Sequence, residues 1–226
     1  MKAMKMTPLT LFWAVLLLSI GSVACGPSEA VVNAPEDGET GIVLSSEYIS
    51  LASDEMIDQA DLVFQGQVTA ISTTQFNQES GAYWDEGRPY HTITFQVLRP
   101  IVDTINVGQE VTVTVWGNNP TEESVPVEQN GQEIRIFSNA EHDLQVGDTV
   151  IAFVERRELM WREGKHEALV LLGVPSESYY RLQAGDRYLG GPARESITVE
   201  ELVDRVAEQR SVSEQPAIEP ESTPSE

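Results

Sequence analysis

The residue types that most often carry out chemistry occur in this chain without the spacings that an enzyme needs. The three histidines, His91, His142 and His166, are far apart, and none forms a His-x-x-x-His or His-x-His metal pair. We expect each of them on the surface or on a strand face. Gly-x-Ser-x-Gly, a catalytic cysteine and a glycine-rich phosphate loop are all missing. The sequence therefore predicts no catalytic residue, no metal site and no cofactor.

Acidic residues are abundant, and one group has a helical spacing. Asp54, Asp58 and Asp61 are about one helical turn apart, so a helix would place their carboxylates together, where they could hold Ca²⁺. An EF-hand loop pattern does not accompany them, and a solvated acidic face is the simpler interpretation. Two carboxylates could also serve glycoside hydrolysis. A secreted hydrolase that uses clustered carboxylates is thus one alternative function.

The strongest candidate for a binding site is the segment from Gln75 to Tyr90, where aromatic residues stand among polar ones between two predicted strands. Trp116 ends the following strand and is expected nearby. Aromatic rings stack on sugars or fill a partner's pockets, and Trp and Tyr are frequent at interfaces. The alternative is a minor core that covers one end of the fold. The predicted ligand-binding residues are Phe76, Tyr83, Trp84, Tyr90 and Trp116.

The only cysteine, Cys25, directly follows a segment with the layout of an export signal. The apolar run within residues 1–24 is shorter than the ~20 residues of a membrane span. Ser22-Val23-Ala24-Cys25 resembles a bacterial lipobox, whose cysteine receives a diacylglyceryl group, although a lipobox usually has Leu in the place of Ser22. The same residues suit ordinary signal peptidase. We expect lipidation of Cys25; the alternative is a secreted protein with a free cysteine.

The mature chain is strongly acidic. Two of the 14 basic residues, Lys2 and Lys5, lie in the signal, which leaves 12 basic against 36 acidic residues and a net charge of −24. A nucleic-acid partner would need a basic surface, and so would electrostatic binding to anionic headgroups. A single cysteine permits no internal disulfide and no zinc site with several thiolates. The hydrophobic core alone must therefore hold the fold together.

Composition divides the chain into four parts. Residues 1–24 are predicted to be a signal peptide, and residues 25–47 the lipidated cysteine with a flexible acidic linker. Residues 48–210 form the expected β-barrel domain with a C-terminal helix. Residues 211–226 are rich in Ser, Pro and Glu and are predicted to be a disordered acidic tail.

Alternation of apolar and polar residues dominates from residue 62 to 190 and predicts about seven short strands. Gly66 interrupts the first strand, which is typical of a bulge or a bend that curls a sheet. Residues 105–111 and 144–150 share an apolar-x-Val-Gly pattern, which indicates two similar turns that each lead into a strand. The predicted fold class is mainly β, a small OB-like closed or partly open barrel.

The clearest predicted helix runs from Thr198 to Arg210. Thr198 and Glu201 form a capping box at its start, and Glu201 is spaced to pair with Arg205 one turn later. Val199, Leu202, Val203 and Val206 line one face of this helix. We expect that face to pack on the sheet as a lid.

Three segments resemble a group of bacterial secreted proteins similar to the OB-like barrel of tissue inhibitors of metalloproteinases and netrin modules. They are Ala60-Asp61-Leu62-Val63-Phe64-Gln65-Gly66-Gln67-Val68, Thr94-Phe95-Gln96-Val97-Leu98 and Val146-Gly147-Asp148-Thr149-Val150-Ile151-Ala152-Phe153, and the resemblance covers about residues 58 to 205. Arg99-Pro100 departs from the Lys-Gly turn of that group. The resemblance implies the barrel. It does not imply protease inhibition. Those inhibitors chelate the metal of a protease with a free N-terminal cysteine, and lipidation of Cys25 would block the corresponding groups here.

The sequence thus favours a membrane-anchored extracytoplasmic lipoprotein that acts as a non-enzymatic binding or assembly module. Its expected partners are the membrane, through the N-terminal lipid, and an envelope or extracellular protein or glycan. A protease-inhibitor-like module and the hydrolase are the alternatives.

Overall fold

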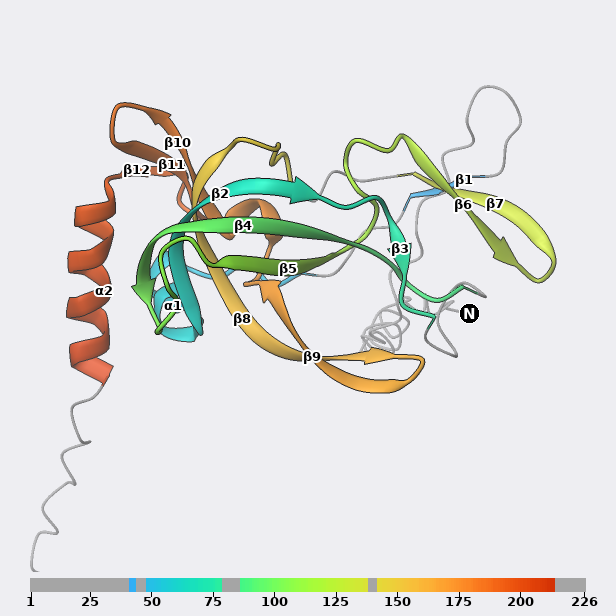
Figure 1. The fold of residues 1–226 in the computed structure, drawn as a ribbon, viewed down its shortest axis with the longest axis horizontal. Coiled ribbons are helices and arrows are strands. Elements are labelled where there is room, and N and C mark those ends of the chain that lie inside the picture. The colour runs from blue at the N-terminus through green and yellow to red at the C-terminus, as the bar shows by residue number, and fades with distance from the viewer. Residues whose placement is uncertain (1–40, 44–47, 79–85, 138–141, 214–226) are drawn as a thin grey trace, which may run out of the picture.

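The computed structural model describes residues 41–43, 48–78, 86–137 and 142–213, which form two β-sheets and two α-helices (Figure 1). The helices are α1 (Ser53–Gln59) and α2 (Val199–Ser213), and a 3₁₀ turn, η1, covers Pro175–Glu177. The strands are β1 (Gly41–Val43), β2 (Leu62–Ile71), β3 (Gln75–Phe76), β4 (Pro89–Val102), β5 (Glu110–Trp116), β6 (Ser124–Gln129), β7 (Gln132–Phe137), β8 (Thr149–Trp161), β9 (Gly164–Leu171), β10 (Tyr179–Ala184), β11 (Arg187–Gly190) and β12 (Glu195–Ile197).

Five strands of the larger sheet form a barrel. The pairing runs β8-β2-β4-β5-β9, and β9 pairs again with β8. The β5–β9 contact is parallel and is limited to Thr114 opposite Val170, whereas the other pairs are antiparallel and longer. The third barrel strand pairs with the fifth, and the fourth returns to the first, as in an OB-like barrel. The prediction of a mainly β, partly open barrel is confirmed.

The barrel interior is filled by the inward faces of these strands. Phe64 and Phe95 meet there edge to face, with ring centroids 5.6 Å apart. The predicted bend at Gly66 is present, because the β2–β4 register shifts between Gln65 and Gly66. A Cβ atom at Gly66 would lie 2.9 Å from the Phe64 ring, so only glycine lets this ring pack against the strand.

A second apolar layer lies outside the barrel, between its wall and the helices. Met56 and Ile57 of α1 and Leu202 and Val206 of α2 pack there against Phe153 of β8. The capping box of α2 is confirmed, since Thr198 N–H donates to Glu201 and Glu201 N–H donates to Thr198 Oγ1. The predicted pairing of Glu201 with Arg205 is wrong. Arg205 binds Glu195 at 2.6 Å, and Glu201 pairs with Arg187 of β11.

The two Val-Gly turns are equivalent in detail. Gly108 N–H donates to Val97 O and Val97 N–H to Gln109 O; Gly147 N–H donates to Val68 O and Val68 N–H to Asp148 O. Both glycines have positive φ, at 82° and 98°. The repeated pattern therefore does mark similar corners of one curled sheet.

The smaller sheet, in the order β1-β7-β6, lies at the opposite end of the molecule from α2 (Figure 1). Its β6–β7 hairpin has a small core around Val127 and Ile136. Asn118 joins it to the barrel by donating from Nδ2 to Ile136 O at 2.9 Å. Within the described ranges, neither helix is long and apolar enough to cross a membrane.

Candidate ligand-binding site

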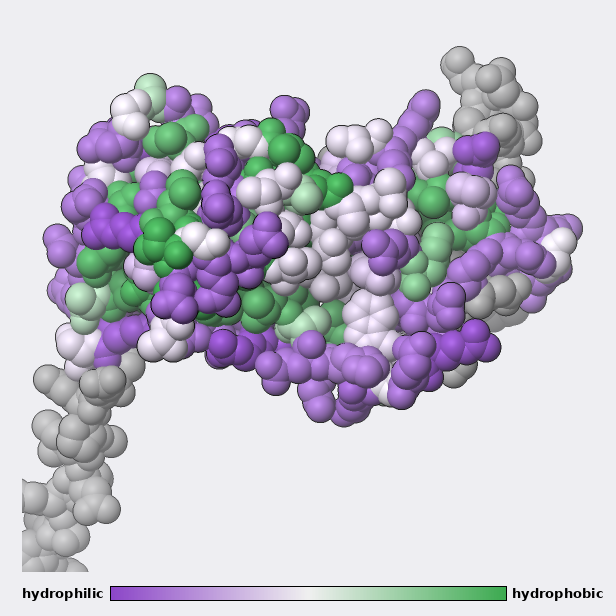
Figure 2. Space-filling view, in the orientation of Figure 1, coloured by the Kyte–Doolittle hydropathy of each residue, from purple (hydrophilic) through white to green (hydrophobic). Residues whose placement is uncertain are grey.

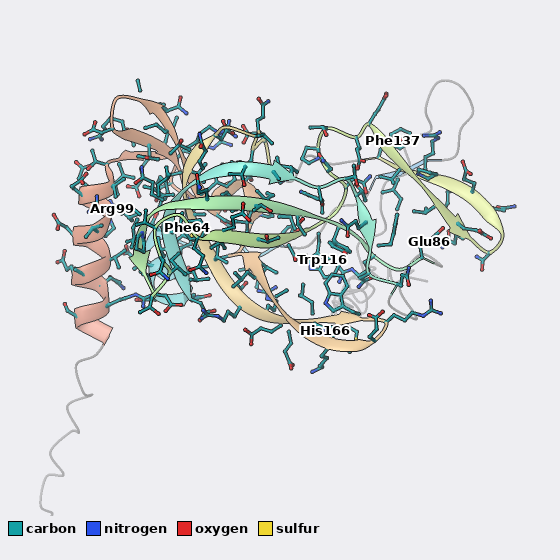
Figure 3. All side chains as sticks on the ribbon, in the orientation of Figure 1. Phe64, Glu86, Arg99, Trp116, Phe137 and His166 are labelled. Carbon is teal, nitrogen blue, oxygen red and sulfur yellow. The ribbon has the colours of Figure 1, made fainter. Side chains whose placement is uncertain are left out.

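Three aromatic side chains from three different strands converge at one end of the barrel. They are Tyr90 at the start of β4, Trp116 at the end of β5 and Trp161 at the end of β8. The Tyr90 and Trp161 centroids lie 4.8 Å apart, and each lies 6.2 Å from the Trp116 centroid. All three side chains are half-buried. Figure 3 shows Trp116 between the end of β5 and the arm formed by β8 and β9. We call these three residues the aromatic cluster.

Two polar partners orient the aromatic cluster. The guanidinium of Arg88 lies 4.6 Å from the Trp116 ring centroid, a cation–π distance. The Tyr90 hydroxyl donates to Gln75 Oε1 at 2.8 Å. Burial raises the pKa of Tyr90, so its hydroxyl keeps its proton and remains a donor.

The structure separates the five residues predicted to bind ligand. Tyr90 and Trp116 lie together, as expected. Phe76 packs instead against Val127 and Ile136 in the core of the β6–β7 hairpin. Tyr83 and Trp84 lie outside the described residues. Sequence reasoning missed Trp161, although Gly164, three residues later, is a recognisable turn signal. Arg162 and Glu163 form the hairpin turn that returns the chain along β9.

Asn77, which is 3% exposed, holds the parts of the site together. Its Oδ1 accepts from Arg88 N–H at 2.7 Å, and its Nδ2 donates to Met160 O at 2.9 Å. Gly87 has φ of 100°, and a Cβ there would lie 2.6 Å from Asn77 Oδ1. The start of β4 and the tip of the β8–β9 hairpin are thus fixed by one buried amide.

The segment after Trp116 is fixed in the same manner. Asn119 donates from Nδ2 to Ser72 O at 2.8 Å, and its N–H donates to Thr74 Oγ1 at 2.9 Å. Glu122 accepts from both the N–H and the hydroxyl of Thr74. The connection from β2 to β4 is therefore tied to the end of β5.

A cavity of about 180 Å³ lies beside Trp116, over the short seam between β5 and β9. Its polar lining includes Gln59, Thr114, Glu155 and Arg157, and its apolar lining comes mainly from Ile49, Leu51 and residues 170–172. Glu155 and Arg157 form an ion pair, and burial raises the pKa of the Glu155 carboxyl. The cavity thus offers an amide, a hydroxyl, a carboxylate and a guanidinium beside an aromatic ring.

Two of the three histidines form a buried pair. His91 is fully buried and His142 is 1% exposed, and their Nε2 atoms lie 2.8 Å apart. Burial lowers the pKa of both, that of His142 to about 3 with a further contribution from His91. The expectation of a surface or strand-face position is wrong for His142, which is buried in the segment before β8. It is confirmed for His166, which is exposed on β9.

The predicted acidic group, Asp54, Asp58 and Asp61, does not form a cation site. Asp61 accepts from Arg156 N–H at 2.6 Å, and Asp58 accepts from Gln209 Nε2 at 3.0 Å. Asp58 and Asp61 therefore each link a different pair of elements. In the described part of the chain, there is no group of three or more His, Cys, Asp or Glu residues that could hold a metal ion.

Comparison with known proteins gave no match: no family model, no curated protein and no solved structure is significantly similar to this chain. The likeness to metalloproteinase inhibitors and netrin modules therefore remains a prediction. Cys25, the predicted lipidation residue, lies outside the described residues.

Proposed function

We propose that the protein is a lipid-anchored extracytoplasmic module that binds a saccharide at the aromatic cluster and the adjoining cavity. The observation that carries the proposal is the convergence of Tyr90, Trp116 and Trp161 beside a polar-lined cavity. In OB-folds, ligands bind on the face of the second and third strands and on the loops between strands one and two and strands four and five. Tyr90, Trp116 and Trp161 come from these places in the barrel.

The chemistry of the site suits a sugar. Trp and Tyr rings offer a flat apolar surface with a polar edge, which complements the apolar and hydroxyl faces of a pyranose ring. Gln59, Thr114 and Glu155 supply donors and acceptors for hydroxyl groups within the same cavity. Its volume of about 180 Å³ is below the ~300–1,000 Å³ of sites for drug-sized ligands. It therefore suits one sugar unit at the end or side of a longer chain.

Charge restricts the saccharide further. The mature chain carries 36 acidic and 12 basic residues, and Arg157 at the cavity is already paired with Glu155. An anionic polysaccharide would be repelled over long distances by this surface. Neutral or amino sugars are therefore the proposed ligands.

The membrane anchor rests on the sequence of residues 22–25, and the acidic linker to residue 47 would hold the barrel away from the membrane. The hydrolase alternative lacks support, since two of the clustered carboxylates, Asp58 and Asp61, serve as structural acceptors. An inhibitor would require a free Cys25 amine next to the barrel.

The test uses the chain from residue 25 onward with Cys25→Ser, which gives a soluble form. We expect soluble neutral or amino-sugar oligosaccharides to bind it in calorimetric titrations and to change its tryptophan fluorescence. Trp116→Ala should weaken binding at least tenfold. Phe137→Ala, which removes a half-buried aromatic of β7 at some distance from the cluster (Figure 3), should leave it unchanged. Equal affinities of the Trp116→Ala variant and the unchanged chain would contradict the proposal.

A further inference from the structure

The His91–His142 pair lies directly beneath the aromatic cluster. His91 follows Tyr90 on β4, and its side chain points into the barrel while that of Tyr90 points out. Its Nδ1 lies 3.1 Å from the carbonyl oxygen of Gly117, the residue after Trp116. His91 therefore lies on the strand that carries Tyr90 and contacts the backbone of the residue that follows Trp116.

Hydrogen bonds at both ends fix the tautomers of the two rings. Leu144 N–H donates to His142 Nδ1 at 3.1 Å, so that nitrogen carries a lone pair and His142 Nε2 carries the hydrogen. His91 Nδ1 must carry a hydrogen, because it faces a carbonyl oxygen. His142 Nε2–H consequently donates to the lone pair of His91 Nε2. All four ring nitrogens are satisfied when both rings are neutral.

One added proton disrupts this series of hydrogen bonds at whichever ring nitrogen it binds. On His91 Nε2 it would face the N–H of His142, and on His142 Nδ1 it would face the N–H of Leu144. Either position sets two donors against each other and leaves a charge in a closed interior. The neutral and protonated pairs therefore cannot share one geometry.

The charged groups around the pair do little to stabilise such a charge. Glu122, from the segment after β5, favours a proton on His91, but its carboxylate is already bound to Thr74. Asp143 next to His142 favours a proton there, and Arg181 of β10 opposes it. Asp143 and Arg181 are paired at 2.7 Å, and Tyr179, also of β10, donates to the same carboxylate. Their effects on His142 thus largely cancel.

We propose that the His91–His142 pair is a proton-binding switch: the neutral pair holds the ends of β4 and β5 against the segment 142–144, and binding of a proton separates them and loosens the aromatic cluster. The consequence for ligand binding rests on the proposed function. The loosening of the cluster does not, since it is measurable without ligand.

The experiment is a pH titration of the Cys25→Ser chain from residue 25 onward, followed by NMR of the imidazole nitrogens and the Trp116 and Trp161 indole N–H groups. At pH 7 we expect the Nδ1–H tautomer for His91 and the Nε2–H tautomer for His142. On acidification, imidazole and indole signals should change with one midpoint, below pH 6.5 and above about 3, while strand content by circular dichroism is retained. Indole signals that stay constant while the pair titrates would overturn the switch. Loss of the whole fold at the same midpoint would also overturn it.

Variants separate the pair from other acid effects. His142→Gln keeps an N–H donor toward His91 but cannot titrate, and should lower the midpoint of the indole change by at least one pH unit. His166→Gln, at the exposed histidine of β9, should leave the midpoint unchanged. If His142→Gln does not fold, the titration of the unchanged chain decides alone. If the coupled change is observed but no saccharide binds, the switch is supported and the proposed function is rejected. If saccharide binds while the aromatic cluster does not respond to pH, the proposed function is supported and the switch is rejected.

Discussion

Asn77 Nδ2 donates a hydrogen bond of 2.9 Å to Met160 O, and this bond joins two segments that are 83 residues apart in the sequence. The same amide accepts from Arg88, whose guanidinium covers Trp116. A side chain that is itself 3% exposed therefore determines where the three aromatic rings meet. The proposed binding surface depends on this buried polar contact as much as on the rings.

Replacement of Asn77 tests this dependence. Asn77→Ala leaves Arg88 N–H and Met160 O without their partner, which we expect to cost about 1–3 kcal/mol of stability. Saccharide affinity should fall at least tenfold, because Trp161 loses its fixed position. Urea unfolding and calorimetric titration measure the two effects. Asn106→Ala, in an exposed turn, is the matched control and should change neither. Normal affinity in a destabilised Asn77→Ala variant would show that the amide serves the fold only.

The bend in β2 provides a second test, directed at the barrel. A Cβ at Gly66 would lie 2.9 Å from the Phe64 ring and 3.3 Å from Gln96 O. Gly66→Ala should therefore destabilise the protein by about 1–3 kcal/mol through overpacking. In the double variant with Phe64→Leu, we expect the two costs to be less than additive, since removal of the ring relieves the closest contact. Full additivity in chemical denaturation would show that the backbone contact, not the ring, requires glycine.

The barrel was predictable because its signals are local. Alternation in β2, β4 and β5, the interruption at Gly66 and the repeated Val-Gly turns each depend on a few neighbouring residues. The capping box at Thr198 belongs to the same class. Arg205, by contrast, has two acidic partners within reach, and the choice of Glu195 depends on how β12 packs beside α2.

The site was predictable only in part, because its members come from different strands. Tyr90 and Trp116 were found as aromatic residues next to predicted turns. Phe76 has the same local signature but packs into the hairpin core instead. The His91–His142 pair spans 51 residues, and short metal or catalytic motifs do not report such a contact. Its recognition requires the strand register that places both rings inside the barrel.

The lipid anchor is a prediction about Cys25 that mass spectrometry decides. We expect the mature protein from membranes to begin at Cys25 and to carry added acyl mass on this residue. Cys25→Ser has no thiol to receive the lipid, so it should lack that mass. Without the acyl chains that stable attachment requires, it should move from the membrane to the soluble fraction. Ser22→Ala, which alters a residue of the same segment and leaves the cysteine in place, is the control and should retain the anchor. A mature chain that starts at Cys25 without acyl mass would show ordinary signal-peptidase cleavage.

Stability should fall as the pH decreases below 6.5, and the sign follows from the buried histidine pair. Burial lowers the pKa of His91 and His142 in the folded state, that of His142 to about 3, whereas both titrate near 6.5 in the unfolded chain. Between these values the unfolded chain binds more protons, so the free energy of unfolding decreases with decreasing pH. At one pKa unit per 1.36 kcal/mol, His142 alone can lower the free energy of unfolding by at most about 4–5 kcal/mol, and local opening of the pair would reduce this loss.

Urea denaturation at pH 7, 5.5 and 4 measures the loss of stability, which should be smaller in His142→Gln and unchanged in His166→Gln. An equal loss in all three proteins would assign the acid sensitivity to carboxylates such as Asp143 and Glu195, whose lowered pKa values act in the same direction at lower pH.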